Sequence, residues 1–283
     1  MAESGSIIPF DRIPDGFAER IDDPPMAPVE PRPAATIVLL RDGADGLELL
    51  LMKRNRSAGF VPGAFVFPGG RVDSADASED MLALIDGLDP DEAARRLEIE
   101  DGDTPAIAYY LAALREAFEE TGILVGLRSD GTPPPAAADS SDVDRIRDEL
   151  MTDAISFAEA VGRLECRIAA DDIEYIAHWI TPRPEPRRYD TRFFAAHVPS
   201  DATPIVDPRE MSDALWIRPT DALRRCDEGS LPMVFPTIKT IEQLTAFESA
   251  DEALAAYGRA PVRTILPTLV ITPTGIGLEI DED

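Results

Sequence analysis

Cysteine, basic residues and long apolar runs are scarce in this sequence. The two cysteines, Cys166 and Cys226, lie far apart and show no Cys-x-x-Cys spacing, which argues against a disulfide framework and against a zinc site. No apolar run approaches the ~18 residues needed to span a bilayer. The N-terminal stretch also lacks the basic start and apolar core of a signal peptide. We therefore expect a cytoplasmic protein with no membrane partner.

Positive charge is in short supply throughout. The chain has 54 Asp and Glu residues against 27 Lys and Arg, which gives a formal net charge of -27 at pH 7. Such a surface repels polyanions over long distances, so the composition excludes non-specific binding of nucleic acid. With 283 residues, 44% of them hydrophobic, the chain can nevertheless bury a sizeable core.

We divide the chain into a proline-rich tail, residues 1–34, and a single folded domain, residues 35–283. The tail includes DDPPMAPVEPRP, a composition that does not form a core of its own. Strand and helix patterns are mixed along the domain, which predicts helices packed on both faces of a mixed sheet.

Local patterns place the elements of this domain. Apolar alternation and turn residues predict strands at 35–41, 47–54, 173–182, 189–198 and 214–219, and a hairpin over 267–280. Helical spacing and capping residues predict helices at 89–98, 105–121, 220–225 and 236–246, with a helical cap over about 142–170.

The helix expected at 105–121 has two different sides. Thr104 is placed to cap it, Pro105 to take its first position and Gly122 to end it. Its larger apolar residues recur on one side of the helix: Ile107, Tyr110, Leu111, Leu114 and Phe118. This side is expected to face the core.

Three glutamates, Glu116, Glu119 and Glu120, lie with Arg115 within an arc of roughly 140° away from that apolar side. An ordinary solvated face with an Arg115–Glu119 pair would explain an isolated acidic helix. The residues upstream change this interpretation, because the loop FPGG, Phe67 to Gly70, and the acidic helix together match a known sequence motif.

Together, GGRVDSAD and REAFEETGI resemble the nudix box, which reads Gly, five residues, Glu, seven residues, then Arg-Glu-apolar-x-Glu-Glu-x-Gly-apolar. The second half matches at every specified position: Arg115, Glu116, Ala117, Glu119, Glu120, Gly122 and Ile123. In the first half Gly70 fits, while Asp76 stands where the family has glutamate.

A long insertion separates the two halves of the box. Residues 77–114 occupy the place of seven, so that about 77–104 is inserted before the helix. The sequence is similar in this respect to nudix enzymes related to the peroxisomal coenzyme A diphosphatase of animals. The segments WITP and RRYDTRFF extend the likeness, which runs from about residue 35 to 244.

This resemblance implies a nudix-type α/β/α sandwich and an enzyme that hydrolyses a nucleoside diphosphate linked to another moiety. It implies Mg²⁺ or Mn²⁺ as cofactor, with Glu116, Glu119 and Glu120 as ligands directly or through water. Any of the three is then a candidate for the base that deprotonates the attacking water. Arg115 would orient Glu119. A homodimer is expected by analogy.

The glycines and a second motif concern the substrate. Gly69 and Gly70 would allow a sharp turn and a close approach to metal or phosphate. Coenzyme A-directed nudix enzymes carry a motif of the form LLTxR followed by FPGG, and several residues match its spacing: Leu50, Leu51, Arg54, Gly63 and Phe67 to Gly70. Three positions differ from it: Met52, Asn55 and Gly59.

The resemblance therefore implies coenzyme A or acyl-coenzyme A as the favoured substrate, contacted by Arg54, Phe67, Gly69 and Gly70. Arg56 is a candidate replacement for the missing second arginine. ADP-ribose, dinucleotide cofactors and other nucleoside diphosphate derivatives remain alternatives. A nudix-fold nucleotide sensor without turnover is the alternative of another class.

For several further residues the sequence leaves the role open or favours a structural one. Glu210 is either an additional ligand or base or an exposed loop acid, and Asp76 is a second acid whose role is open. His178 and His197 are expected to be structural. Arg187 and Arg188 are weak candidates for contacts to phosphate, and Trp179 and Trp216 are expected in the core.

Overall fold

The computed structural model describes residues 7–9, 21, 29–55, 62–99 and 103–280. An eight-stranded mixed sheet lies at its centre, with the main strand order β11-β3-β2-β10-β9-β12. Two short strands complete it, since β4 pairs with β3 and β5 pairs with β2. The bounds of the first four are β2 (Arg32–Gly43), β3 (Gly46–Arg54), β4 (Phe65–Val66) and β5 (Gly69–Arg71). The others are β9 (Ile173–Ile180), β10 (Tyr189–His197), β11 (Met211–Ile217) and β12 (Thr264–Ile265).

The central strands are buried on both faces because their sequences are almost continuously apolar. In β2, Ile37 and Leu39 point into the core on one face of the sheet, while Val38 and Leu40 point into the core on the other. The pairing of β2 with β10 is parallel, whereas that of β2 with β3 is antiparallel. The expected mixed sheet is therefore confirmed.

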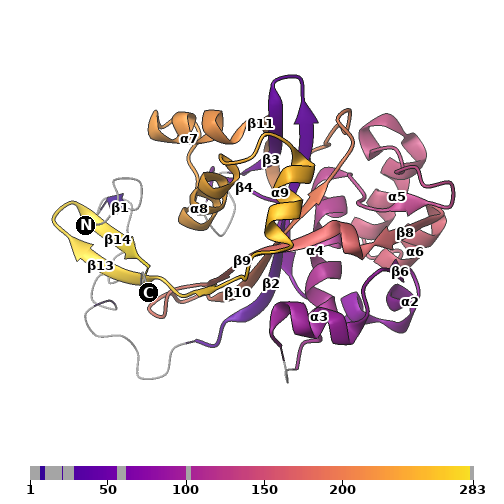
Figure 1. Ribbon diagram of the computed structural model, residues 1–283, viewed down its shortest axis with the longest axis horizontal. Helices are drawn as coiled ribbons and strands as arrows, with labels where there is room; N and C mark the ends of the chain where they lie inside the picture. The colour runs from indigo at the N-terminus through magenta and orange to yellow at the C-terminus, as the bar shows by residue number, and fades with distance from the viewer. Residues whose placement is uncertain (1–6, 10–20, 22–28, 56–61, 100–102, 281–283) are drawn as a thin grey trace.

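Helices cover both faces, as the sandwich requires (Figure 1). One face packs against α4 (Ala106–Thr121), together with α3 (Pro90–Leu97), α5 (Ser141–Met151) and α6 (Phe157–Arg163). The other face packs against α7 (Pro219–Asp227), α8 (Phe235–Leu244) and α9 (Ala250–Tyr257). No helix among the described residues is long and apolar enough to cross a membrane.

The box insertion and the helical segment near 141–169 form one unit beside α4, which we call the side lobe (Figure 1). The insertion contributes α2 (Glu79–Leu82), β6 (Ile85–Asp86) and α3. Strand β8 (Cys166–Ala169) pairs with β6 in parallel and with β7 (Leu127–Arg128) in antiparallel orientation. The side lobe thus joins segments about 80 residues apart on the surface of α4.

The expected helical cap over 142–170 is wrong in its last part. Two helices, α5 and α6, fill most of the range, but Cys166–Ala169 is strand β8. Cys166 and Ile168 are buried while Arg167 between them is exposed, which is the alternation of a strand. Its partner β6 lies in the insertion, far outside any local sequence window.

The helix predictions need two corrections, one at the start of α4 and one for a helix that was not predicted. Helix α4 begins at Ala106, and Pro105 is its N-cap with φ -59° and ψ 137°, so Thr104 does not cap the helix. Helix α9 was not expected. Ser249 caps it through a hydrogen bond from the Glu252 amide, a signal that the sequence carries.

The two ends of the described chain share a second, smaller sheet. Strand β1 (Ile7–Pro9) pairs with β14 (Gly275–Glu279), which pairs in turn with β13 (Thr268–Thr272). The C-terminal hairpin is therefore confirmed. This three-stranded sheet projects to one side of the molecule (Figure 1). Strand β2 begins at Arg32, three residues before its expected start, and most of 1–28 lies outside the described residues.

Candidate active site

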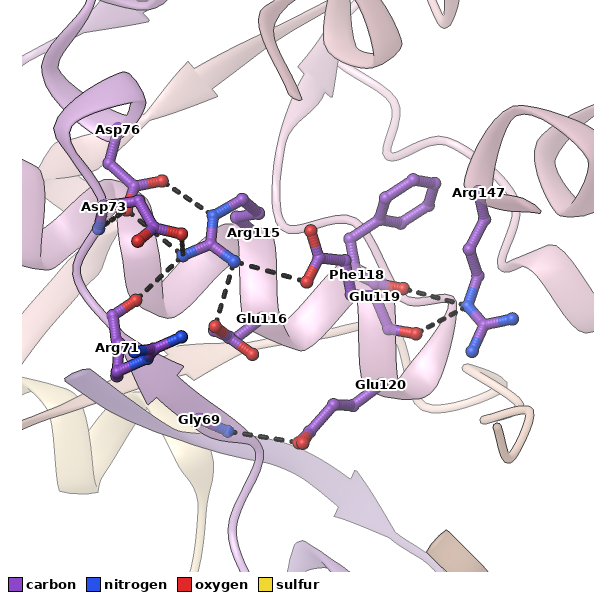
Figure 2. A network of polar contacts seen from close by, with 10 residues as sticks. All are labelled: Gly69, Arg71, Asp73, Asp76, Arg115, Glu116, Phe118, Glu119, Glu120 and Arg147. Carbon is purple, nitrogen blue, oxygen red and sulfur yellow. Dashed lines mark hydrogen bonds and ion pairs between the residues drawn. The ribbon is translucent and has the colours of Figure 1, made fainter. Parts of the chain in front are cut away.

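The acidic side of α4 lies against β5, and glycine makes this approach possible. A Cβ atom on Gly70 would lie 2.3 Å from Oε1 of Glu116, so any larger residue there would displace the Glu116 carboxylate. The amide of Gly69 donates a hydrogen bond to Oε2 of Glu120 at 3.2 Å (Figure 2). The expected sharp turn is absent, because Gly69 and Gly70 lie in strand β5 and neither has a positive φ. The two glycines instead allow neighbouring parts of the chain to approach β5 closely.

Arg115 links the two halves of the box (Figure 2). Its Nε and Nη2 donate to the carboxylate of Asp76 at 2.7 and 3.1 Å. Its Nη1 donates to Oε1 of Glu116 at 2.9 Å and to Oε2 of Glu119 at 3.2 Å. Nη2 also donates to the carbonyl of Arg71 at 2.9 Å. Arg115 thus contacts Glu119 as expected, and it holds two further carboxylates in place.

Asp76 owes its position to a short 3-10 helix, Ser74–Ala77. The Asp73 amide donates to Oδ2 of Asp76 at 2.8 Å, which closes a capping box. The whole residue is 3% exposed, so its charge requires a partner, and Arg115 supplies one. The aspartate at the family's glutamate position therefore pairs with Arg115.

The three glutamates hold protons more tightly than free carboxylates do. Burial raises the pKa of Glu119 to about 7, although the charge of Arg115 opposes the change. Burial also raises the pKa of Glu116, with Arg115 again opposing it. The pKa of Glu120 lies well above its usual value, first because of burial and then because of the charge of Glu116. A bound cation would remove this unfavourable environment.

A cleft of about 350 Å³ opens beside these side chains. Its lining residues come from the segment after β5, α4, the end of α5 and the segment before β11: Asp73, Arg115, Glu116, Glu119, Glu120, Leu150, Met151, Asp153, Asp207, Arg209 and Glu210. Glu210 is therefore at the site, and its charge contributes to the raised pKa of Glu116 and Glu120. Asp207 and Arg209 pair with each other at 3.0 Å.

Arg54 lies near the glutamates, whereas Phe67 does not. The positive charge of Arg54 lowers the pKa of Glu120, and its buried Nε has no hydrogen-bond partner in the described part of the chain. Phe67 is 4% exposed and packs edge-on against Phe193 in the core on the sheet face opposite α4. The apolar ring is thus used for packing. Arg56 lies outside the described residues.

The weaker candidates have structural partners. His178 contacts Asp190 at 2.6 Å and Thr264 at 2.8 Å within the sheet. Arg188 is buried and donates to the carbonyls of Thr181 and Val29. His197 contacts Asp251 at 3.1 Å.

The donor chemistry of the cleft suits a hard divalent cation. No group of three or more His, Cys, Asp or Glu side chains in the described ranges is spaced as a complete metal site, and Arg115 bridges Glu116 and Glu119. Mg²⁺ does not need such a group, because one or two carboxylates, waters and substrate phosphates complete its shell. Glu116, Glu119 and Glu120 fit that requirement.

A family model described as the NUDT19 Nudix domain matches residues 29–244 of this chain. The chain belongs to the nudix hydrolases. This nudix hydrolase is 29% identical over 265 residues to the acyl-coenzyme A diphosphatase NUDT19 of Homo sapiens. The match covers 82% of this chain and 70% of the human protein. It is 27% identical over 248 residues to putative nudix hydrolase 7 of Caenorhabditis elegans, covering 84% of this chain and 71% of that one.

A solved structure shows the same fold. The crystal structure of a nudix hydrolase from Alicyclobacillus acidocaldarius superposes with a TM-score of 0.67 at 30% identity. The match covers 83% of this chain and 100% of that chain. The expected enzyme class and the nudix-type sandwich are therefore confirmed.

Sequence reasoning missed the contribution of the side lobe to this nudix hydrolase. Leu150 and Met151 of α5 line the cleft, and Arg147 contacts the end of α4. Arg147 gave no signal in the sequence beyond being a basic residue on a helix. Its burial, at 4% exposure, becomes visible only when α5 is packed against α4.

Proposed function

We propose that this nudix hydrolase cleaves the diphosphate bond of coenzyme A or acyl-coenzyme A. Water adds to one phosphorus atom and the bridging P–O bond breaks, which yields adenosine 3′,5′-bisphosphate and phosphopantetheine or its acyl ester. The observation that carries the proposal is the likeness to acyl-coenzyme A diphosphatases over most of the chain, at 29% and 25% identity. The partial LLTxR–FPGG motif points the same way.

The chain's own residues supply the positioning for this reaction. Glu116, Glu119 and Glu120 would hold Mg²⁺ or Mn²⁺, and one of them would take the proton of the attacking water. When bound, the cation would neutralise phosphate oxygens and orient the water for in-line attack. Arg115 fixes the direction of the carboxylates through hydrogen bonds to Glu116 and Glu119. The carboxylates belong to helix α4 and lie against strand β5, which keeps them in position for the substrate.

Arg54 is the proposed contact to a substrate phosphate. Its buried Nε has no partner among the described residues, and a guanidinium pairs well with phosphate oxygens. Gly69 and Gly70 leave the backbone beside the cleft free of side chains. Phe67 is not part of the proposed contact surface. The cytoplasmic location, the homodimer and the division into a tail and one domain remain predictions from the sequence.

The purified protein should be incubated with Mg²⁺ and, separately, with coenzyme A, acetyl-coenzyme A, ADP-ribose, NADH and diadenosine polyphosphates. Mass spectrometry would identify the products, and Glu120→Gln serves as the inactive control. We expect adenosine 3′,5′-bisphosphate from the coenzyme A substrates and none from the control. Preferred cleavage of ADP-ribose or a dinucleotide would overturn the substrate assignment. Binding of a nucleotide with no cleavage of any substrate would instead indicate a sensor.

A further inference from the structure

Arg147 reaches the end of α4 from the side lobe (Figure 2). Its Nε donates to the carbonyl oxygen of Glu119 at 2.8 Å and to that of Phe118 at 3.2 Å. The residue is 4% exposed. A guanidinium removed from water in this way needs compensating hydrogen bonds, and here two of them go to the backbone of the helix that carries the glutamates.

The last turn of α4 depends on such donors. The final carbonyls of an α-helix have no amide partner within the helix. Gly122 ends α4 with φ 70°, and the next amide, that of Ile123, donates to Oγ1 of Thr121 at 3.1 Å. Within the described chain, the hydrogen bond to the Glu119 carbonyl outside the helix therefore comes from Arg147. A positive charge at this end also suits the helix dipole.

Two further hydrogen bonds from outside the helix to carbonyls of this turn come from backbone amides, while the Thr121 side chain donates within the helix to the Ala117 carbonyl at 2.6 Å. The amide of Ile205 donates to the Thr121 carbonyl at 2.8 Å, and the amide of Ala137 donates to the Gly122 carbonyl at 2.9 Å. Among the described residues, Arg147 is thus the side chain that donates from outside the helix to the main chain of the turn containing Glu119 and Glu120. Arg115 orients the carboxylates of Glu116 and Glu119, whereas Arg147 holds the main chain of the turn.

The remaining end of Arg147 is poorly satisfied. Its Nη2 is buried with no hydrogen-bond partner in the described ranges. Burial lowers the pKa of Arg147, while the negative charge of Asp207, at the cleft, acts against this. An apolar side chain of similar size would avoid the unfavourable burial. Fold stability alone therefore gives a weak reason for an arginine here.

We propose that Arg147 is a positioning residue of this hydrolase. It fixes the last turn of α4 and so directs the carboxylates of Glu119 and Glu120 into the cleft. The side lobe would then be a working part of the active site, because its helix α5 sets the geometry of the α4 carboxylates. The proposal rests on the proposed function in one respect, since it takes these carboxylates to bind the divalent cation.

The main test variant is Arg147→Met, which removes the hydrogen bonds to α4 and keeps most of the buried volume. Arg147→Lys is the conservative variant that retains the charge. The matched control is Arg145→Met on the same helix, because Arg145 is 57% exposed and pairs with Glu149 at 2.6 Å. Three properties are measured: Mn²⁺ affinity by calorimetry without substrate, hydrogen exchange of peptides covering 116–124, and steady-state kinetics.

We expect Arg147→Met to fold with little loss of thermal stability and to weaken Mn²⁺ binding by ~10- to 100-fold, the range typical for residues that orient metal ligands. Exchange should accelerate at 119–122, and kcat should fall in parallel while KM for coenzyme A changes little. Arg147→Lys should recover part of the Mn²⁺ affinity. Arg145→Met should behave as wild type.

Wild-type Mn²⁺ affinity and wild-type exchange at 119–122 in Arg147→Met would overturn the proposal. So would a variant that loses thermal stability but keeps both properties, since that result describes a purely structural residue. If Arg147→Met does not fold, Arg147→Lys decides by the same measurements. If the wild-type protein binds Mn²⁺ but does not cleave coenzyme A, the substrate proposal fails, while the metal and exchange data still judge Arg147.

Discussion

The glycine of β5 that faces Glu116 shows how closely the active site is packed. Oε1, the carboxyl carbon and Oε2 of Glu116 lie 2.3, 2.5 and 2.7 Å from the position that a Cβ atom on Gly70 would take. Such distances force a shift of the carboxylate. The family's glycine at this position is therefore explained by space for a glutamate, because its backbone is an ordinary extended strand.

We predict that Gly70→Ala moves the Glu116 carboxylate away from its present position and lowers kcat by at least ~10-fold, as loss of ligand orientation does. The measurement is steady-state hydrolysis at several Mg²⁺ concentrations. Gly162→Ala is the matched control, because a Cβ at Gly162, in helix α6, meets no atom within 4 Å. Equal activity of Gly70→Ala and the control would contradict the prediction.

Several residues could be placed correctly from sequence alone, and others could not. Helical spacing puts Arg115, Glu116, Glu119 and Glu120 together, and the resemblance to the nudix box marked them as candidate site residues. Phe67 was misplaced: the LLTxR–FPGG motif implied a contact with substrate, but its ring is buried on the sheet face opposite α4.

At the scale of elements, α4 combines an apolar side with a partly buried acidic side, and this makes the stability of the protein depend on pH. The pKa of Glu119 is about 7 in the folded protein and 4.5 in a free side chain. Between these two values the unfolded chain releases a proton that the folded chain keeps. The free energy of unfolding contributed by this group is therefore greatest below pH 4.5 and is lost as pH rises towards 7 and beyond.

We predict that the metal-free protein becomes less stable to urea between about pH 5 and pH 8, and that Mg²⁺ restores most of the loss at the upper end. Urea unfolding in chelator at several pH values measures this. Glu119→Gln should flatten the dependence, since the amide does not titrate. A rise in metal-free stability across the same range would show that other groups dominate.

The elements divide into those with local signals and those without. Helix α4 and strands β2 and β3 follow from their own periodicity and turns. Strand β8 does not, because β6, its partner in the insertion, is ~80 residues away in the sequence. The anchoring of α5 to α4 through Arg147 is equally non-local. Sequence patterns thus identified the helix that carries the candidate site residues but not the side lobe packed against it.

At the scale of the whole molecule, the net charge of -27 bears on how an anionic substrate arrives. Coenzyme A derivatives and other nucleoside diphosphates are also negative, so protein and substrate repel each other before contact. Salt screens this repulsion, with a Debye length of about 10 Å at 0.1 M. Arg54 acts only at short range.

We predict that kcat/KM rises as monovalent salt increases from about 10 to about 150 mM at constant free Mg²⁺, while kcat changes little. Initial rates at low substrate concentration measure the effect, and an uncharged osmolyte at matched osmolarity is the control. A fall in kcat/KM over this range would mean that a local positive field at the cleft outweighs the overall charge.

The ion pair between Asp76 and Arg115 has one further consequence. The polypeptide leaves the central fold at Asp76, builds part of the side lobe, and returns in the helix that carries Arg115, with the two side chains 2.7 Å apart. The ion pair therefore joins the two ends of this chain segment. A single cut inside the insertion would leave two fragments joined by this clamp, by the pairing of β2 with β10 and of β3 with β11, and by the packing of α4 on the sheet. In this respect the enzyme consists of two complementary parts of the chain, and the boundary between them lies within the nudix box.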